Sequence, residues 1–123
     1  MSPHLQVWRW HITMACSILN RATGIALYAG ALILAAWALS LAAGPQAYGT
    51  FRSVLGSLPG KVVLFALTVS IFFHLAAGVR HLAWDLGVGF EPRTAEMTGA
   101  ASIAFAVVAA IVVWVIAGMM GAL

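Results

Sequence analysis

The chain has 123 residues, of which 63% are hydrophobic and only 7% are charged. Soluble domains contain about 25% charged residues, and a domain of this size leaves much of its surface in water. Six Lys and Arg with three Asp and Glu cannot cover such a surface. The single Cys16 excludes a disulfide scaffold. The composition therefore predicts that lipid surrounds most of the chain.

The net charge of +3 raises the question of a nucleic-acid partner. A nucleic-acid-binding surface needs its positive charge concentrated on one face. The basic residues are instead spread along the chain, at Arg9, Arg21, Arg52, Lys61, Arg80 and Arg93. Scattered basic residues in an apolar chain are typical of the ends of membrane-spanning segments, so we expect no nucleic-acid partner.

Three long apolar segments are the main predicted elements. A transmembrane helix needs about 20 mostly apolar residues, because the hydrocarbon core of a bilayer is about 30 Å thick. Segments that meet this condition cover about residues 22–43, 62–85 and 98–123. We therefore expect an all-α integral membrane protein, a single domain over residues 1–123. In it, three transmembrane helices follow a short N-terminal segment at the cytoplasmic face.

Short connections with Gly and Pro separate the first two spans. Three spans place the termini on opposite sides of the membrane. The side of the N-terminus carries Arg9, Arg21, Arg80 and Arg93, and the other side carries Arg52 and Lys61. Because Lys and Arg favour the cytoplasmic side, we expect the N-terminus in the cytoplasm or matrix. Trp8, Trp10 and Trp84 fall where an aromatic belt on that face would lie.

His74 is the most unusual residue of the second span. An ionisable residue near the middle of the bilayer is costly and therefore indicates a function. Neutral imidazole is a common axial ligand of haem iron. His81 lies on the same helical face but about 10 Å further along the axis, so the two side chains cannot grip one iron from both sides. Gly78, between them, leaves space for a flat macrocycle.

A haem with two histidine ligands would therefore need a second polypeptide or a second copy of this one. The remaining histidines, His4 and His11, precede the first span and are expected at the membrane surface.

Each residue of this cluster also has a structural interpretation that the sequence leaves open. His74 can hydrogen-bond a neighbouring helix, and Gly78 can allow close helix packing. Arg80 can act as an interfacial anchor, since Arg snorkels readily. His81 can pair with Asp85, which lies four residues later.

A second polar cluster lies where the first span enters the membrane. Ser17 and Arg21 are four residues apart and share a helical face. A hydroxyl and a guanidinium can donate to a quinone carbonyl, and Arg21 also to haem propionates. The structural alternative is that Arg21 only anchors the helix and Ser17 only starts it.

At these two clusters the sequence resembles the cytochrome b membrane-anchor subunit of succinate dehydrogenase (respiratory complex II), the larger of its two anchors. Residues 2–9 and 17–24 look like the N-terminal signature of that family, although Asn20 stands where many members carry His. The family pattern His-x-x-x-Gly-x-Arg-His-x-x-Trp-Asp-x-Gly is met by His74, Gly78, Arg80, His81, Trp84, Asp85 and Gly87.

The resemblance implies a role for each site residue. His74 matches the axial ligand of haem b, and the smaller anchor subunit supplies the opposite ligand. Ser17 and Arg21 match the ubiquinone-binding residues, close to the iron–sulfur subunit. Arg21 and His81 are the expected partners of the haem propionates.

The resemblance also implies that a flavoprotein subunit oxidises succinate and that the iron–sulfur subunit passes the electrons to ubiquinone. The chain itself has no independent catalytic constellation, so any enzyme activity belongs to the complex. We expect the bacterial inner membrane rather than the mitochondrial one, because the chain is short and lacks an Arg/Ser-rich leader. Two alternatives remain open: a component of a small transporter or channel, and a haem-free structural anchor.

Overall fold

The computed structural model describes the backbone of residues 3–123 and the side chains of residues 14–123. It contains the helices α1 (Pro3–Ala43), α2 (Pro45–Gly56), α3 (Leu58–Asp85) and α4 (Pro92–Met119). This part of the chain contains no strand, so the all-α prediction is confirmed. Three of these helices are long and apolar enough to cross a membrane. The segments that meet this condition are Met14–Ala43 of α1 and the whole of α3 and α4. The predicted three spans are therefore present.

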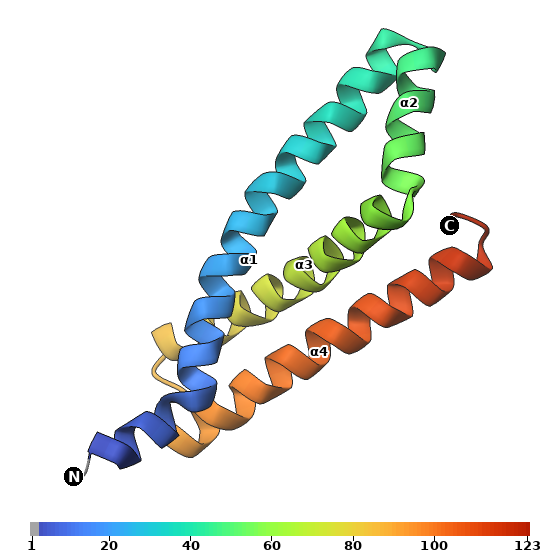
Figure 1. The fold of residues 1–123 in the computed structure, drawn as a ribbon. Helices are drawn as coiled ribbons and strands as arrows, with labels where there is room; N and C mark the ends of the chain where they lie inside the picture. The colour runs from blue at the N-terminus through green and yellow to red at the C-terminus, as the bar shows by residue number, and fades with distance from the viewer. Residues whose placement is uncertain (1–2) are drawn as a thin grey trace.

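The long helices form an open bundle (Figure 1). Helix α1 crosses α3 and α4 near one end of the molecule, and α3 packs along α4. The N-terminal end of α1 and the α3–α4 connection lie at this end, whereas α2 and the C-terminus lie toward the other. The arrangement brings the first half of α1 against the second half of α3, where both polar clusters of the sequence lie.

The helices extend beyond the predicted apolar segments. Helix α1 is continuous from Pro3, because its polar residues Ser17, Asn20 and Arg21 do not interrupt helical hydrogen bonding. The first connection contains a feature that the sequence analysis did not expect, the twelve-residue helix α2. Pro45 lies at its first turn, where the fixed φ of proline favours helix and its missing N–H costs no hydrogen bond.

The turn between α2 and α3 depends on a close backbone approach. Ser57 caps α3, and its hydroxyl accepts a hydrogen bond from the Gly60 N–H at 3.3 Å. A Cβ atom on Gly60 would lie 2.6 Å from the Cα of Leu55 and would also collide with the Val54 carbonyl oxygen. Only glycine fits here without moving α2 away from α3.

The end of α3 is fixed by a Schellman motif. Gly87 has a φ of +81°, its N–H donates to the Trp84 carbonyl at 2.8 Å, and the Val88 N–H donates to the Ala83 carbonyl at 3.0 Å. This turn leads the chain back toward α4.

Small side chains make the close contacts between the long helices. Ala77, Ala106 and Ala110 are buried, and Phe73 is the large side chain that packs with Ala77, Ala106 and Cys16. Small residues allow helices in lipid to approach closely, where dispersion forces and hydrogen bonds hold them together. One such hydrogen bond joins α4 to α3, from Trp114 Nε1 to Thr68 Oγ1 at 3.0 Å.

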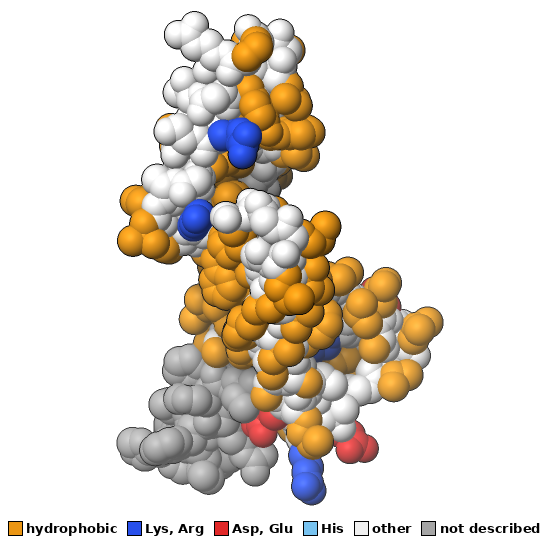
Figure 2. Space-filling model, turned by 90° about the vertical axis from the view of Figure 1, so that its right-hand side faces the viewer, with side chains coloured by type: hydrophobic (Ala, Val, Ile, Leu, Met, Phe, Trp, Pro, Cys, Tyr) orange, Lys and Arg blue, Asp and Glu red, His pale blue; other side chains and the backbone are white. Residues whose placement is uncertain are grey.

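Large hydrophobic side chains cover the outside of the described bundle. Figure 2 shows them over much of the visible face, with acidic side chains in its lower half and basic side chains at separate levels. Such a surface matches a lipid environment.

Candidate functional site

His74 lies in the second half of α3, and its imidazole is held against α1. The ring is half-buried, and its Nδ1 atom lies 3.2 Å from the hydroxyl oxygen of Thr23. A Cβ atom built on Gly24 would lie 3.7 Å from His74 Cε1, so the ring lies beside this glycine at a distance where an added methyl group would touch it. This is the contact expected from the structural interpretation of His74. It uses Nδ1 and leaves Nε2 as the nitrogen able to face a ligand.

An apolar depression adjoins the imidazole. It has a volume of about 480 Å³ and is lined by Leu27, Ile71, His74, Leu75, Gly78, Val79 and Leu82. A Cβ atom on Gly78 would meet no heavy atom within 4 Å, so open space does lie beside this glycine. From one side, a haem needs an axial ligand such as imidazole for its iron and apolar side chains around its ring. The residues of this chain therefore fit a haem at this position.

A second, more polar cavity joins three of the predicted site residues. Ser17, Arg21 and His81 all line it, together with Cys16, Asn20, Phe73, Ala77, Arg80, Trp84 and Ser102. Its volume is about 400 Å³. The cavity thus joins the α1 cluster to the His81 end of the α3 cluster, but it does not include His74.

This polar cavity has an asymmetric lining. Ser17 and Arg21 are exposed at its α1 side and carry hydrogen-bond donors. Phe73 and Ala77 are buried and give it an apolar floor on α3. A small ring with polar oxygens fits such a lining, because the floor packs against the ring and the donors meet the oxygens.

His74 and His81 face different spaces. His74 lines the apolar depression and His81 the polar cavity. Two turns of α3 separate the histidines, and α1 covers His74 with Thr23. The structure thus places a candidate iron ligand next to, but not inside, the cavity of Ser17 and Arg21.

His81 has an aromatic neighbour. Its ring meets that of Trp84 edge to face, with centroids 5.2 Å apart and an interplanar angle of 89°. Trp84 in turn donates from Nε1 to the Gly89 carbonyl at 3.0 Å and stacks on Phe90. These contacts fix one wall of the polar cavity to the α3–α4 turn.

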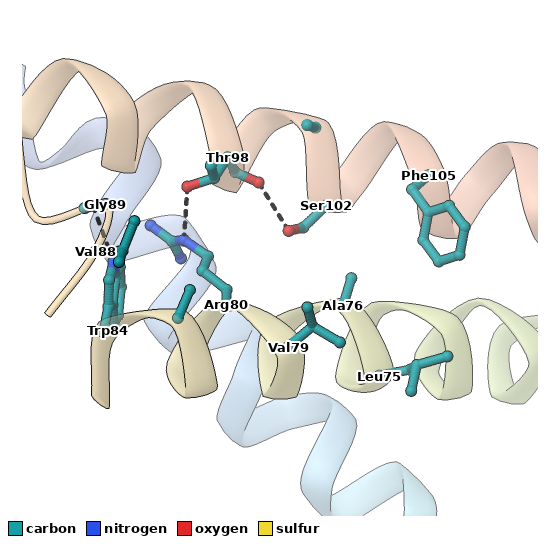
Figure 3. A pocket seen from close by; sticks show the side chains of 12 residues that line it. Leu75, Ala76, Val79, Arg80, Trp84, Val88, Gly89, Thr98, Ser102 and Phe105 are labelled. Atoms are coloured by element: carbon teal, nitrogen blue, oxygen red, sulfur yellow. Dashed lines mark hydrogen bonds between the residues drawn. The ribbon is translucent and has the colours of Figure 1, made fainter. Parts of the chain in front are cut away.

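Arg80 joins α3 to α4 (Figure 3). Its Nε donates to Thr98 Oγ1 at 3.0 Å, and its Nη2 donates to the Ala95 carbonyl at 2.7 Å. Its guanidinium carbon lies 4.4 Å from the ring centroid of Trp84. The side chain that the sequence indicated as an interfacial anchor therefore bonds to a neighbouring helix of the same chain.

Thr23 is a site residue that the sequence analysis missed. It belongs to the segment 17–24 that carries the family resemblance, but no periodicity within one helix shows which residue of α1 meets His74. Several other residues named from the sequence have side chains outside those that the structure describes: His4, Trp8, Arg9, Trp10 and His11.

Comparisons with known proteins identify the family of the chain. Residues 1–113 match the family model described as succinate dehydrogenase/fumarate reductase transmembrane subunit. A succinate dehydrogenase cytochrome b556 subunit of Paracoccus denitrificans is 35% identical over 116 residues, which cover 94% of this chain and 89% of that protein. The same subunit of Rickettsia felis is 35% identical over 114 residues, covering 93% and 89%. A mitochondrial cytochrome b560 subunit of Mus musculus is 34% identical over 109 residues, covering 87% and 64%. The chain therefore belongs to the transmembrane subunit family of succinate dehydrogenase and fumarate reductase.

Proposed function

We propose that this chain is the larger membrane-anchor subunit of a succinate:quinone oxidoreductase, that it holds haem b through His74, and that it helps to form the quinone-reduction site. The relatives are named cytochrome b subunits, which supports a haem. The observation that carries the proposal is the placement of His74. A membrane-embedded imidazole bonds through Nδ1 to α1 and borders an apolar depression left open at Gly78.

A smaller anchor subunit supplies the second haem ligand in this proposal. His81 cannot do so, because it is about 10 Å from His74 along α3 and lines a different cavity. The depression at His74 is walled by exposed Leu75 and Val79, which leaves it accessible to a helix of another chain. When bound, the haem adds a one-electron carrier beside the quinone site.

Arg21 and Ser17 bind the quinone in the polar cavity. The Ser17 hydroxyl and the Arg21 guanidinium donate hydrogen bonds to a carbonyl oxygen of ubiquinone. Negative charge develops on the quinone oxygens during reduction, and the fixed cation of Arg21 stabilises it. Phe73 and Ala77 provide the apolar floor for the ring.

Arg21 and His81 also contact the haem propionates. Both side chains line the polar cavity, which shares no lining residue with the depression at His74 but is built on the same stretch of α3. If a haem propionate entered this cavity, Arg21 would be the charged donor that α1 offers it.

The soluble subunits dock at the end of the bundle that carries the polar cavity. A flavoprotein subunit oxidises succinate, and an iron–sulfur subunit delivers the electrons to quinone. Arg21, Arg80 and Arg93 lie toward this end, and Arg52 and Lys61 lie toward the other, which supports a cytoplasmic N-terminus by the positive-inside rule. The location proposed is the bacterial inner membrane, with the mitochondrial inner membrane as the alternative.

A reduced-minus-oxidised absorbance spectrum of the purified complex tests the proposal. We expect the bands of a low-spin haem b, together with succinate-dependent quinone reduction. Quinone reduction without haem bands would indicate a haem-free anchor. Absence of both, with ion flux in reconstituted vesicles, would indicate a transporter or channel component.

A further inference from the structure

We propose that Thr23 is a positioning residue for the haem ligand. Its hydroxyl accepts a hydrogen bond from the Nδ1–H of His74 and thereby selects the tautomer that presents Nε2 to the iron. This inference rests on the proposed function, because it takes His74 as the axial ligand.

The tautomer follows from the two contacts of the Thr23 hydroxyl. Its oxygen lies 3.1 Å from the Asn20 carbonyl oxygen and 3.2 Å from His74 Nδ1. A threonine hydroxyl has one hydrogen, and a carbonyl oxygen can only accept. The hydroxyl hydrogen therefore goes to Asn20, and its oxygen accepts from His74. Nδ1 then carries the ring proton, and Nε2 keeps the lone pair that a metal needs.

Burial makes this arrangement rigid. Thr23 is only 7% exposed, so water does not compete for its hydroxyl. The bond to Asn20 ties the hydroxyl to its own helix, and the ring of His74 lies beside Gly24, where a built Cβ atom would be 3.7 Å from Cε1. Hydrogen bonds in such a low-dielectric setting are stronger than in water and polarise one another when they form a chain.

The bond also affects the electronic character of the ligand. A histidine that donates its second N–H to an acceptor becomes a more basic ligand. A more basic axial ligand stabilises ferric iron relative to ferrous iron and so lowers the reduction potential. Thr23 would therefore hold the haem at a lower potential than an unsupported imidazole would.

Two substitutions in the purified complex separate the hydroxyl from the packing of Thr23. Thr23→Val keeps the shape of the side chain and removes the hydroxyl, whereas Thr23→Ser keeps the hydroxyl. In redox titrations of the haem absorbance, we expect Thr23→Val to change the ferric-to-ferrous ratio at a given potential by about tenfold. For a one-electron couple this is an upward shift of about 59 mV. Thr23→Ser should titrate like the wild type.

A Thr23→Val complex with the wild-type potential, or a lower one, would overturn the proposal. If Thr23→Val binds too little haem for titration, haem content decides. Full loading of Thr23→Ser then supports the role of the hydroxyl, and haem loss in both variants contradicts it. His74→Leu in the same series tests the underlying assignment of the haem ligand. An unchanged spectrum in His74→Leu refutes His74 as the ligand. Loss of the haem bands in His74→Leu, together with a wild-type potential in Thr23→Val, refutes only the role of Thr23.

Discussion

The guanidinium of Arg80 lies over the indole ring of Trp84, with its central carbon 4.4 Å from the ring centroid. The same guanidinium donates hydrogen bonds to Thr98 and to the Ala95 carbonyl on α4. One side chain thus connects the last turns of α3 to the first turns of α4. Since Arg80 and Trp84 also line the polar cavity, this connection holds one wall of the candidate quinone site.

Replacing Arg80 should therefore loosen the α3–α4 contact. Arg80→Leu removes two charge-assisted hydrogen bonds and a cation–π contact, which together stabilise the fold by about 2 kcal/mol. We expect a lower Tm for the detergent-solubilised complex, measured by tryptophan fluorescence. Arg52→Leu is the matched control, because Arg52 is exposed and lies 5.9 Å from the Tyr48 ring. An equal change of Tm in both variants would contradict the role given to Arg80.

Gly78→Leu should exclude the haem without disturbing the helices. Apart from its chain neighbours and the backbone of its own helix, no heavy atom of the described chain lies within 4 Å of a Cβ atom at Gly78, so the new side chain extends into the space assigned to the macrocycle. Overlap with a bound ring costs about 1–3 kcal/mol, which lowers haem affinity by about 5- to 150-fold. Haem content per complex, measured as the pyridine haemochrome, checks this.

The control for Gly78→Leu is Gly49→Leu on α2. Gly49 also has open space around its Cβ position but lies far along the chain from His74. It should leave haem content unchanged. Full haem occupancy in Gly78→Leu would place the macrocycle elsewhere.

Arg21→Ala should separate the two half-reactions of the complex. Removing a fixed charge donor from the site where charge develops typically lowers the rate by about 100-fold. We expect quinone reduction to fall by this order, while succinate oxidation with an artificial soluble acceptor is retained. Arg93→Ala, an exposed substitution toward the same end, should change neither rate. Equal loss of both activities in Arg21→Ala would indicate failed assembly instead of a quinone-site defect.

The fold was largely predictable from composition, because three apolar segments of sufficient length admit few arrangements in lipid. Helix α2 was not predicted, because Pro45–Gly56 is too short and too polar to cross a membrane and the search was for membrane-spanning segments. Helix α1 begins before the predicted span because a polar cluster around Arg21 shortens an apolar window without breaking a helix.

The site was predictable in its residue types but not in its pairings. Ser17, Arg21 and His81 were chosen for their chemistry, and the fold brings them into one cavity. The contact of Thr23 with His74 joins residues 51 positions apart and depends on how α1 crosses α3. That crossing is set by the small residues between the helices, whose register one sequence does not reveal.

The most direct test of the account is the reduced-minus-oxidised spectrum of the purified complex carrying His74→Leu. Val63→Leu, an exposed substitution on the same helix, serves as the matched control. We predict that Val63→Leu keeps the low-spin haem b bands and that His74→Leu loses or shifts them, while both retain succinate oxidation with an artificial acceptor. Wild-type bands in His74→Leu would contradict the assignment of this imidazole as the haem ligand.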